Sequence, residues 1–134
     1  MSDFRPVFLV IGIFVAVLGG TMLLPVLTDL AHGSDASRAS AEAFSAAAVI
    51  SMGIGGTLAA ASWGHVKQLN TRQGFLITTA SWLALVVAAA LPFAIGEGRL
   101  SITDAFFEAM SGLTTTGSTV VSGLDGRPPG FLLW

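Results

Sequence analysis

Three long stretches without a charged residue dominate the pattern of hydrophobic and polar positions along the chain: residues 6–28, 43–66 and 73–96. A helix needs roughly 20 mostly apolar residues to cross the hydrocarbon core of a bilayer. Each stretch is therefore long enough to span a membrane, and the pattern argues against a water-soluble fold. It predicts membrane-spanning helices over about residues 7–30, 41–63 and 73–96.

Polar connections separate the three predicted helices. The first connection is the mixture of charged and small residues around Asp29, His32, Gly33 and Asp35, which is typical of a loop in water. The second, over residues 64–73, carries two basic residues and no acid. Basic residues are equally numerous on the two sides of the predicted spans, so their count does not fix the orientation.

Small residues recur at four-residue spacing in each predicted span. Such a spacing places a column of small side chains on one helical face. Lipid gives helices no hydrophobic reason to associate, so close backbone approach along such columns is the usual source of packing. The pattern predicts a tightly packed bundle. The columns are Gly12, Ala16 and Gly20; Ala47, Ser51, Gly55 and Ala59; and Ala80, Ala84 and Ala88.

A short helix is predicted over residues 103–113, where hydrophobic residues recur at helical intervals. Ser101 or Thr103 can cap its N-terminus, because a hydroxyl accepts a hydrogen bond from an amide of the first turn. At 1.5 Å per residue this helix rises about 16 Å, roughly half the hydrocarbon thickness. It therefore cannot span a bilayer and must either lie at the surface or dip in and return.

A polar segment, TTTGST, follows this helix at residues 114–119. Gly117 gives the segment access to unusual backbone angles. Non-helical backbone at membrane depth is tolerated only where protein buries it or where it lines water. Extended Thr and Gly residues can aim carbonyl oxygens at a dehydrated monovalent cation, and the C-terminal end of the short helix would direct its negative dipole toward the same place.

Composition narrows the classes of function further. Charged residues make up 10% of the chain and mean hydropathy is +0.79, whereas an ordinary soluble domain has about 25% charged residues. A net charge of −2 without a basic cluster gives no support for nucleic-acid binding. The chain has no cysteine, which excludes disulfides and thiolate catalysis. We expect a membrane protein whose main surroundings are lipid.

Two acids, Asp104 and Glu108, lie four residues apart on one face of the short helix. A catalytic pair is disfavoured because no His, Cys or further acid joins them, so we expect no enzyme. Asp104 is explained as a charge in the first helical turn. Glu108 has two interpretations: it hydrogen-bonds the backbone of residues 114–119 and supports it, or it is simply exposed at the mouth.

The run ITDAFFEAMSGLTTTGSTVVSGLD resembles the first pore helix and selectivity filter of the TrkH/KtrB family of potassium uptake proteins. Further pieces, GGTMLLP, TRQGFLI and LPFAI, occur in the same order as in that family. The resemblance implies an all-α integral membrane fold, with three transmembrane helices followed by a re-entrant pore helix and an extended selectivity-filter loop. Residues 1–66 would form two preliminary helices and residues 67–134 the first pore unit, which ends before its second helix.

Filter roles carry over from the family by position. Thr115 and Thr116 would offer potassium-coordinating carbonyls, and Thr114, Gly117 and Ser118 would frame the filter strand. Glu108 would be the supporting acid. The resemblance implies potassium as the transported ion, with no cofactor and no other metal.

The resemblance also implies a setting for the whole protein. The function would be potassium transport across the bacterial cytoplasmic (inner) membrane by a multi-pass protein, with its N-terminus in the cytoplasm and its filter toward the outside. Partners would be a second copy of the full-length subunit and a cytosolic nucleotide-binding regulatory subunit of the TrkA/KtrA type. One filter segment is present where the family has four, so we expect an N-terminal fragment. The alternative is a non-conducting small helical membrane protein that packs against a partner.

Overall fold

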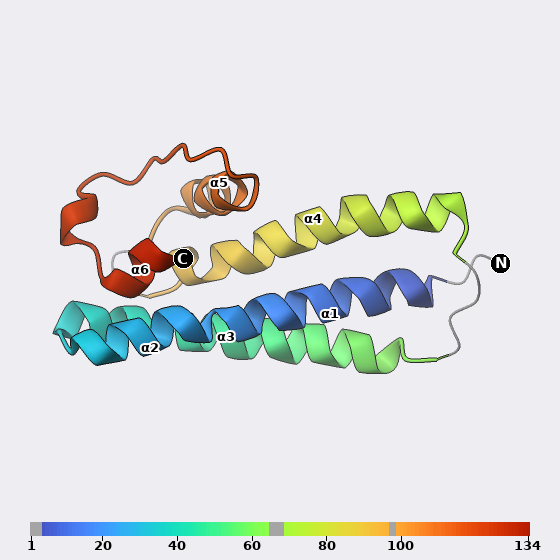
Figure 1. The fold of residues 1–134 in the computed structure, drawn as a ribbon, viewed down its shortest axis with the longest axis horizontal. Helices are drawn as coiled ribbons and strands as arrows, with labels where there is room; N and C mark the ends of the chain where they lie inside the picture. The colour runs from blue at the N-terminus through green and yellow to red at the C-terminus, as the bar shows by residue number, and fades with distance from the viewer. Residues whose placement is uncertain (1–3, 65–68, 97–98) are drawn as a thin grey trace.

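The computed structural model describes residues 4–64, 69–96 and 99–134, and these residues form helices joined by short connections (Figure 1). The helices are α1 (Arg5–Thr21), α2 (Leu23–His32), α3 (Asp35–Ala61), α4 (Thr71–Ala94), α5 (Ile102–Leu113), the 3₁₀ helix η1 (Leu124–Gly126) and α6 (Pro129–Leu133).

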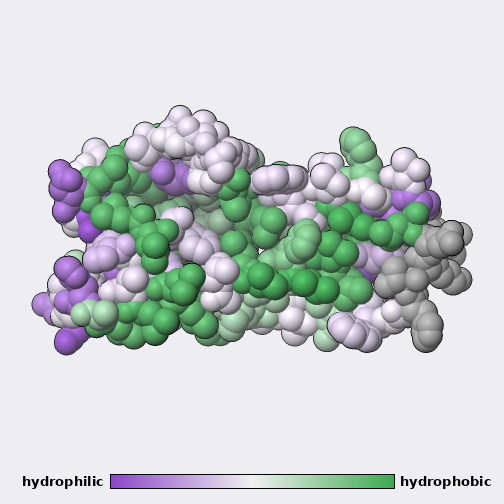
Figure 2. Space-filling model, viewed as in Figure 1, coloured by the Kyte–Doolittle hydropathy of each residue, from purple (hydrophilic) through white to green (hydrophobic). Residues whose placement is uncertain are grey.

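Three helical spans are long and apolar enough to cross a membrane: Arg5–His32, Asp35–Ala61 and Thr71–Ala94. This confirms the prediction of three membrane-spanning helices. Figure 2 shows hydrophobic residues along the helices and hydrophilic residues gathered toward the two ends of the bundle. Large apolar side chains are exposed on these helices, for example Val49 at 68% and Leu27 at 64%. An apolar surface of this extent is suited to lipid or to a protein partner rather than to water.

The first span is built from α1 and α2, which follow one another almost in line and meet at Met22 (Figure 1). Pro25 explains the irregularity, because it has no N–H to donate to the carbonyl four residues earlier, at Thr21. Met22 itself is fully buried, and its N–H donates to the carbonyl of Leu18 at 3.2 Å. The chain therefore keeps its direction while one backbone hydrogen bond is missing.

The predicted water loop between the first two spans is wrong in its length. Asp29 lies inside α2 and is fully buried, and α3 already begins at Asp35. Only two residues connect the helices: Gly33, with φ of +73°, ends α2, and the Ser34 hydroxyl caps α3 by accepting from the amide of Ser37 at 3.1 Å. His32 and Asp35 are exposed at the ends of their helices, where water solvates them, so the polar composition did not require a longer loop.

Close approach of α1 and α3 confirms the prediction of small-residue packing. A Cβ added at Gly55 would lie 2.5 Å from the backbone nitrogen of Ala16, and one at Gly12 would lie 2.6 Å from that of Ala59. Neither position has room for a side chain. The two helix backbones therefore touch directly, as small residues at helix interfaces in membranes allow.

The small-residue column predicted in the first span is wrong at its last member. A Cβ at Gly20 would meet nothing within 4 Å, whereas one at Gly19 would lie 2.9 Å from the backbone nitrogen of Met52. An α-helix has 3.6 residues per turn, so two turns after Gly12 the interface returns at a spacing of seven residues rather than eight.

The third span, α4, begins with a capping box. The Asn70 side chain accepts from the amide of Gln73 at 2.8 Å, and the Gln73 side chain accepts from the amide of Asn70 at 3.0 Å. Its C-terminal half supplies Val86, Ala89 and Phe93 to a core that also includes residues of α5. The domain boundary expected between residues 66 and 67 lies outside the described residues.

We predict that Gly12→Ala lowers the Tm of the full-length protein in detergent by several degrees. The added Cβ would lie 2.6 Å from the nitrogen of Ala59, and overpacking of this kind costs about 1–3 kcal/mol. The matched control is Gly56→Ala, where an added Cβ meets nothing within 4 Å. Equal Tm values for the two variants would show that the helices do not approach as closely as described.

Candidate functional site

The short helix α5 lies across the direction of the spans and is seen end-on in Figure 1. Ser101 caps it by accepting from the amide of Asp104 at 3.1 Å, which confirms one of the two predicted caps. Its buried residues include Ala105 and Ala109, which belong to the same core as Val86 of α4. Val86 lies eight residues before the end of α4, about 12 Å along the helix axis. The helix α5 therefore packs beside the body of the span and not beyond its end.

A tight turn ends α5 at the threonine triplet. The amide of Thr115 donates to the carbonyl of Gly112 at 3.1 Å, and the amide of Thr116 donates to that of Ser111 at 2.9 Å. These two bonds are those of a Schellman motif, whose left-handed position is usually occupied by glycine. Here Thr115 occupies it with φ of +56°. A β-branched residue in this region is strained, and strain of this kind is concentrated at functional sites.

After this turn the chain continues without helix or strand as far as residue 123. Gly117 has φ of +74°, so positive φ angles occur at alternate residues, Thr115 and Gly117. Side-chain bonds hold the turn: the Thr114 hydroxyl donates to the carbonyl of Met110 at 2.7 Å and lies 2.8 Å from the hydroxyl of Thr116. All residues from 114 to 120 are exposed.

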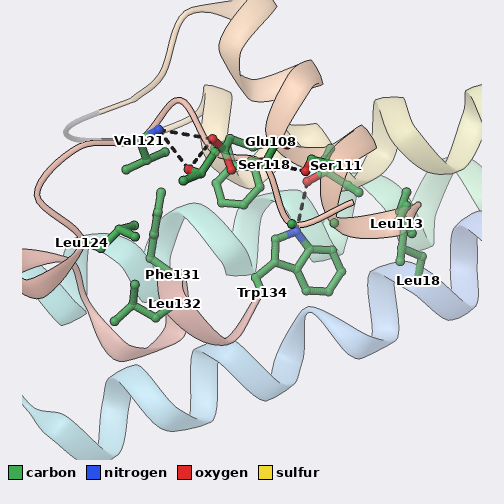
Figure 3. Close-up of a pocket in the computed structure, with 16 residues that line it drawn as sticks. Leu18, Glu108, Ser111, Leu113, Ser118, Val121, Leu124, Phe131, Leu132 and Trp134 are labelled. Atoms are coloured by element: carbon green, nitrogen blue, oxygen red, sulfur yellow. Dashed lines mark hydrogen bonds between the residues drawn. The ribbon is translucent and has the colours of Figure 1, made fainter. Parts of the chain in front are cut away.

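Glu108 fixes the chain directly after this segment (Figure 3). Its Oε1 accepts from the hydroxyl of Thr119 at 2.7 Å, from the amide of Val120 at 2.6 Å and from that of Val121 at 3.3 Å. Hydrogen bonds to an ionised acceptor are about twice as strong as neutral ones. The first of the two interpretations of Glu108, contact with backbone, therefore matches the geometry, although its amide partners lie at Val120 and Val121, beyond residues 114–119.

Ser111 provides a second side-chain anchor on α5. Its hydroxyl donates to the carbonyl of Ser118 at 2.6 Å. Ser111 follows Glu108 by three residues, so both side chains project from one side of the helix. Sequence reasoning missed this residue, although a hydroxyl three positions after the acid is a signal that could have pointed to it.

A pocket of about 520 Å³ lies between α5, the non-helical segment that follows it and α6 (Figure 3). Gly117, Ser118 and Glu108 line its polar part, whereas Phe131 and Trp134 contribute apolar surface from α6. Of the predicted filter residues, Gly117 and Ser118 thus line this pocket, while Thr114, Thr115 and Thr116 form the exposed turn next to it.

The remaining candidate residues do not form a second site. Asp104 lies in the first turn of α5, and His32 is exposed in the last turn of α2. His65 lies outside the described residues. In the part of the chain that the structure describes, no three His, Cys, Asp or Glu side chains gather into a group that could hold a metal ion.

The segment after the turn ends in α6, which is docked on the spans. The Trp134 indole Nε1 donates to the carbonyl of Ala89 at 3.0 Å, and its ring packs edge-on against Phe44 of α3. The amide of Gly130 donates to Oδ1 of Asp29 at 2.6 Å. Asp29 was predicted to lie in a loop and this contact was not expected, although an acid directly after an apolar run was a visible signal.

Comparison with known proteins places this arrangement in a family. A family model described as TrkH, cation transport protein, matches residues 40–134. Potassium uptake proteins named TrkH from Salmonella typhimurium and from Escherichia coli strain K12 are each 39% identical over 132 residues, which cover 98% of this chain and 26% of the relative. The chain thus spans about a quarter of the length of these curated relatives.

A solved structure agrees with this match. The crystal structure of the potassium transporter TrkH from Vibrio parahaemolyticus superimposes with a TM-score of 0.88 at 35% identity, over 98% of this chain and 27% of that one. Sequence and fold therefore agree over nearly the whole chain, and we conclude that the chain belongs to the TrkH family of cation transport proteins.

Proposed function

We propose that this chain is part of a potassium uptake transporter and that residues 114–118 form one segment of its selectivity filter. The similar proteins named potassium uptake protein or potassium transporter support the choice of ion. Under this proposal potassium is the transported cargo and no cofactor takes part. The alternative of a non-conducting helical module is not favoured, because the relatives are named as transporters over a match that covers 98% of the chain.

The position of α5 supports a re-entrant path. The amide of Leu100, just before α5, donates to the carbonyl of Phe93 in the last turn of α4 at 2.9 Å. At the other end of the excursion, Gly130 contacts Asp29 in the last turns of α2. The chain between these contacts leaves and rejoins the bundle at neighbouring helix ends, and α5 packs beside Val86, well inside the span. A pore helix that dips into the bilayer and returns fits this path.

One observation carries the filter assignment: the amides of Thr115 and Thr116 are hydrogen-bonded, while the carbonyls of the same two residues are free. The amides of Thr115 and Thr116 donate to α5. Among the described residues, the carbonyls of Thr115 and Thr116 accept no hydrogen bond. Free carbonyl oxygens can replace the water shell of a potassium ion, and the C-terminal end of the α5 dipole adds negative potential at the same place.

The unusual backbone angles of the segment serve the same purpose. In an ordinary strand successive carbonyls point to opposite sides. Positive φ at Thr115 and Gly117, with other angles between them, departs from this alternation and re-aims the peptide groups. Thr114, Gly117 and Ser118 then frame the carbonyls of Thr115 and Thr116. Glu108 supports the segment by accepting hydrogen bonds from the three residues that follow it, Thr119, Val120 and Val121.

The proposal extends to the setting of the whole protein. We place it in the bacterial inner membrane as a multi-pass protein, with the N-terminus cytoplasmic and the filter toward the outside. Residues 1–66 would be preliminary helices, and residues 67–134 would begin the first pore unit. The complete transporter would act as a homodimer with a cytosolic nucleotide-binding regulatory subunit, and the relatives are named as proteins of a Trk system.

We predict that Gly117→Val in the full-length protein abolishes growth rescue of a strain that lacks potassium uptake, on low-potassium medium. A β-branched side chain strains a backbone with φ of +74°, at a cost of about 1–3 kcal/mol, and shifts the neighbouring carbonyls. The control is Gly33→Val, which has φ of +73° and open space around its Cβ but lies in the α2–α3 connection.

The two glycine variants separate a filter effect from general strain. Gly33→Val should accumulate in the membrane and still rescue growth. Retained rescue by Gly117→Val, at a membrane level equal to wild type, would contradict the filter assignment. Failure of the wild-type protein to transport potassium would contradict the proposed function as a whole.

We further predict that Glu108→Ala raises the KM for potassium uptake about tenfold or more, because it removes a charged acceptor of three hydrogen bonds. Glu108→Gln should show a smaller effect, since its amide oxygen still accepts. Asp104→Ala, one turn earlier on α5, is the control and should keep the wild-type KM. Equal KM values for Glu108→Ala and Asp104→Ala would show that Glu108 does not support the filter.

A further inference from the structure

A buried acid on the first span contacts the C-terminal end of the loop that contains the candidate filter. Asp29 in α2 has no exposed surface. Its Oδ1 accepts from the amide of Gly130 at 2.6 Å, while Oδ2 is buried and has no hydrogen-bond partner among the described residues. A buried carboxylate with a free oxygen is costly, so its presence in an apolar helix requires an explanation.

Gly130 is shaped to receive this carboxylate. A Cβ at this position would lie 2.6 Å from the carbonyl oxygen of Pro25 and would overlap Oδ2 of Asp29. Any other residue would therefore push the start of α6 away from α2. The acid and the glycine form one fitted contact between two helices that are 101 residues apart in sequence.

The contact of Asp29 with Gly130 fixes the C-terminal end of the loop that starts with the filter segment, residues 114–118. Val121 is held by Glu108 of α5, and Gly130 is held by Asp29 of α2. Only residues 122–129 connect the two points. Both ends of this connection are therefore anchored to carboxylates, one on the helix before the segment and one on the first span.

Other contacts keep α6 on the bundle when the Asp29 contact is removed. The Trp134 indole donates to the carbonyl of Ala89 at 3.0 Å, and Phe131 packs edge-on against Phe93. Loss of the carboxylate should therefore release the first turn of α6 and the connection before it, and leave the helix docked. The effect is then expected on the loop rather than on the fold.

We propose that Asp29 is a positioning residue for the filter: with Gly130 it clamps the outgoing end of the loop to the first span and so holds the carbonyls of Thr115 and Thr116 in register for potassium. This inference rests on the proposed potassium uptake. Asp29 acts through the backbone of the loop and does not touch the ion.

The test compares variants of the full-length protein in potassium uptake and in competition by sodium. Asp29→Ala should raise the KM for potassium about tenfold and lower the preference for potassium over sodium, because the acceptor of the Gly130 amide is lost. Gly130→Ala should behave in the same way. Asp29→Asn keeps an acceptor for the Gly130 amide and should lie between wild type and Asp29→Ala. The matched control is Glu42→Ala, which removes an exposed acid from α3 and should match wild type.

A second measurement does not depend on transport. Potassium bound at the filter raises the Tm of the purified protein according to its affinity. The potassium concentration that gives half of this rise should increase about tenfold in Asp29→Ala, which removes the acceptor, and in Gly130→Ala, whose Cβ displaces it. It should stay unchanged in Glu42→Ala.

The outcomes separate this inference from the proposed function. If wild type takes up potassium and the Asp29 and Gly130 variants keep its KM and its preference over sodium, Asp29 is not a positioning residue and the proposed function stands. If none of the three variants accumulates in the membrane, Asp29 serves the fold and the inference is overturned. If the wild-type protein shows no potassium uptake, the proposed function itself fails.

Discussion

A peptide group that leaves the helical pattern loses its helical hydrogen-bond partner, and several amides between residues 100 and 130 find another one. The chain provides fixed acceptors for these amides. Carbonyls of α5 receive the amides of the threonine turn, Glu108 receives those of Val120 and Val121, and Asp29 receives that of Gly130. The carbonyls of Thr115 and Thr116 accept no hydrogen bond among the described residues, and the proposed potassium site depends on them.

Close packing of the long helices provides the scaffold for this loop. Where α1 and α3 meet, glycine lets the two backbones touch, so a stiff pair of helices forms without large side chains between them. The span α4 then offers Val86, Ala89 and Phe93 as a surface for α5. The helix α2, which carries Asp29, is held on α3 by Val26, which packs against a core that includes Phe44 and Ala47.

Much of the fold followed from local patterns. Charge-free stretches predicted three spans, and the length of the next helix excluded a fourth, because these features depend only on neighbouring residues. The connection between α2 and α3 was predicted in the right place but too long, because composition does not distinguish the polar end of a helix from a loop. The interface with α3 includes Gly19 and not the predicted Gly20, because an α-helix has 3.6 residues per turn and not four. The roles of Thr115 and Thr116 as ion ligands remain a proposal.

The sequence by itself determined which segments are long and apolar enough to cross a membrane, and that a short helix and a polar segment follow them, because hydropathy and helical period are local properties. It left the cap of the short helix open between two residues. Only the tertiary structure decided what holds the threonine turn. The contact of Asp29 with Gly130 joins residues 101 positions apart, and the contact of Glu108 with Val120 depends on how the chain turns back. Such pairs are set by packing in three dimensions, which no short sequence window contains.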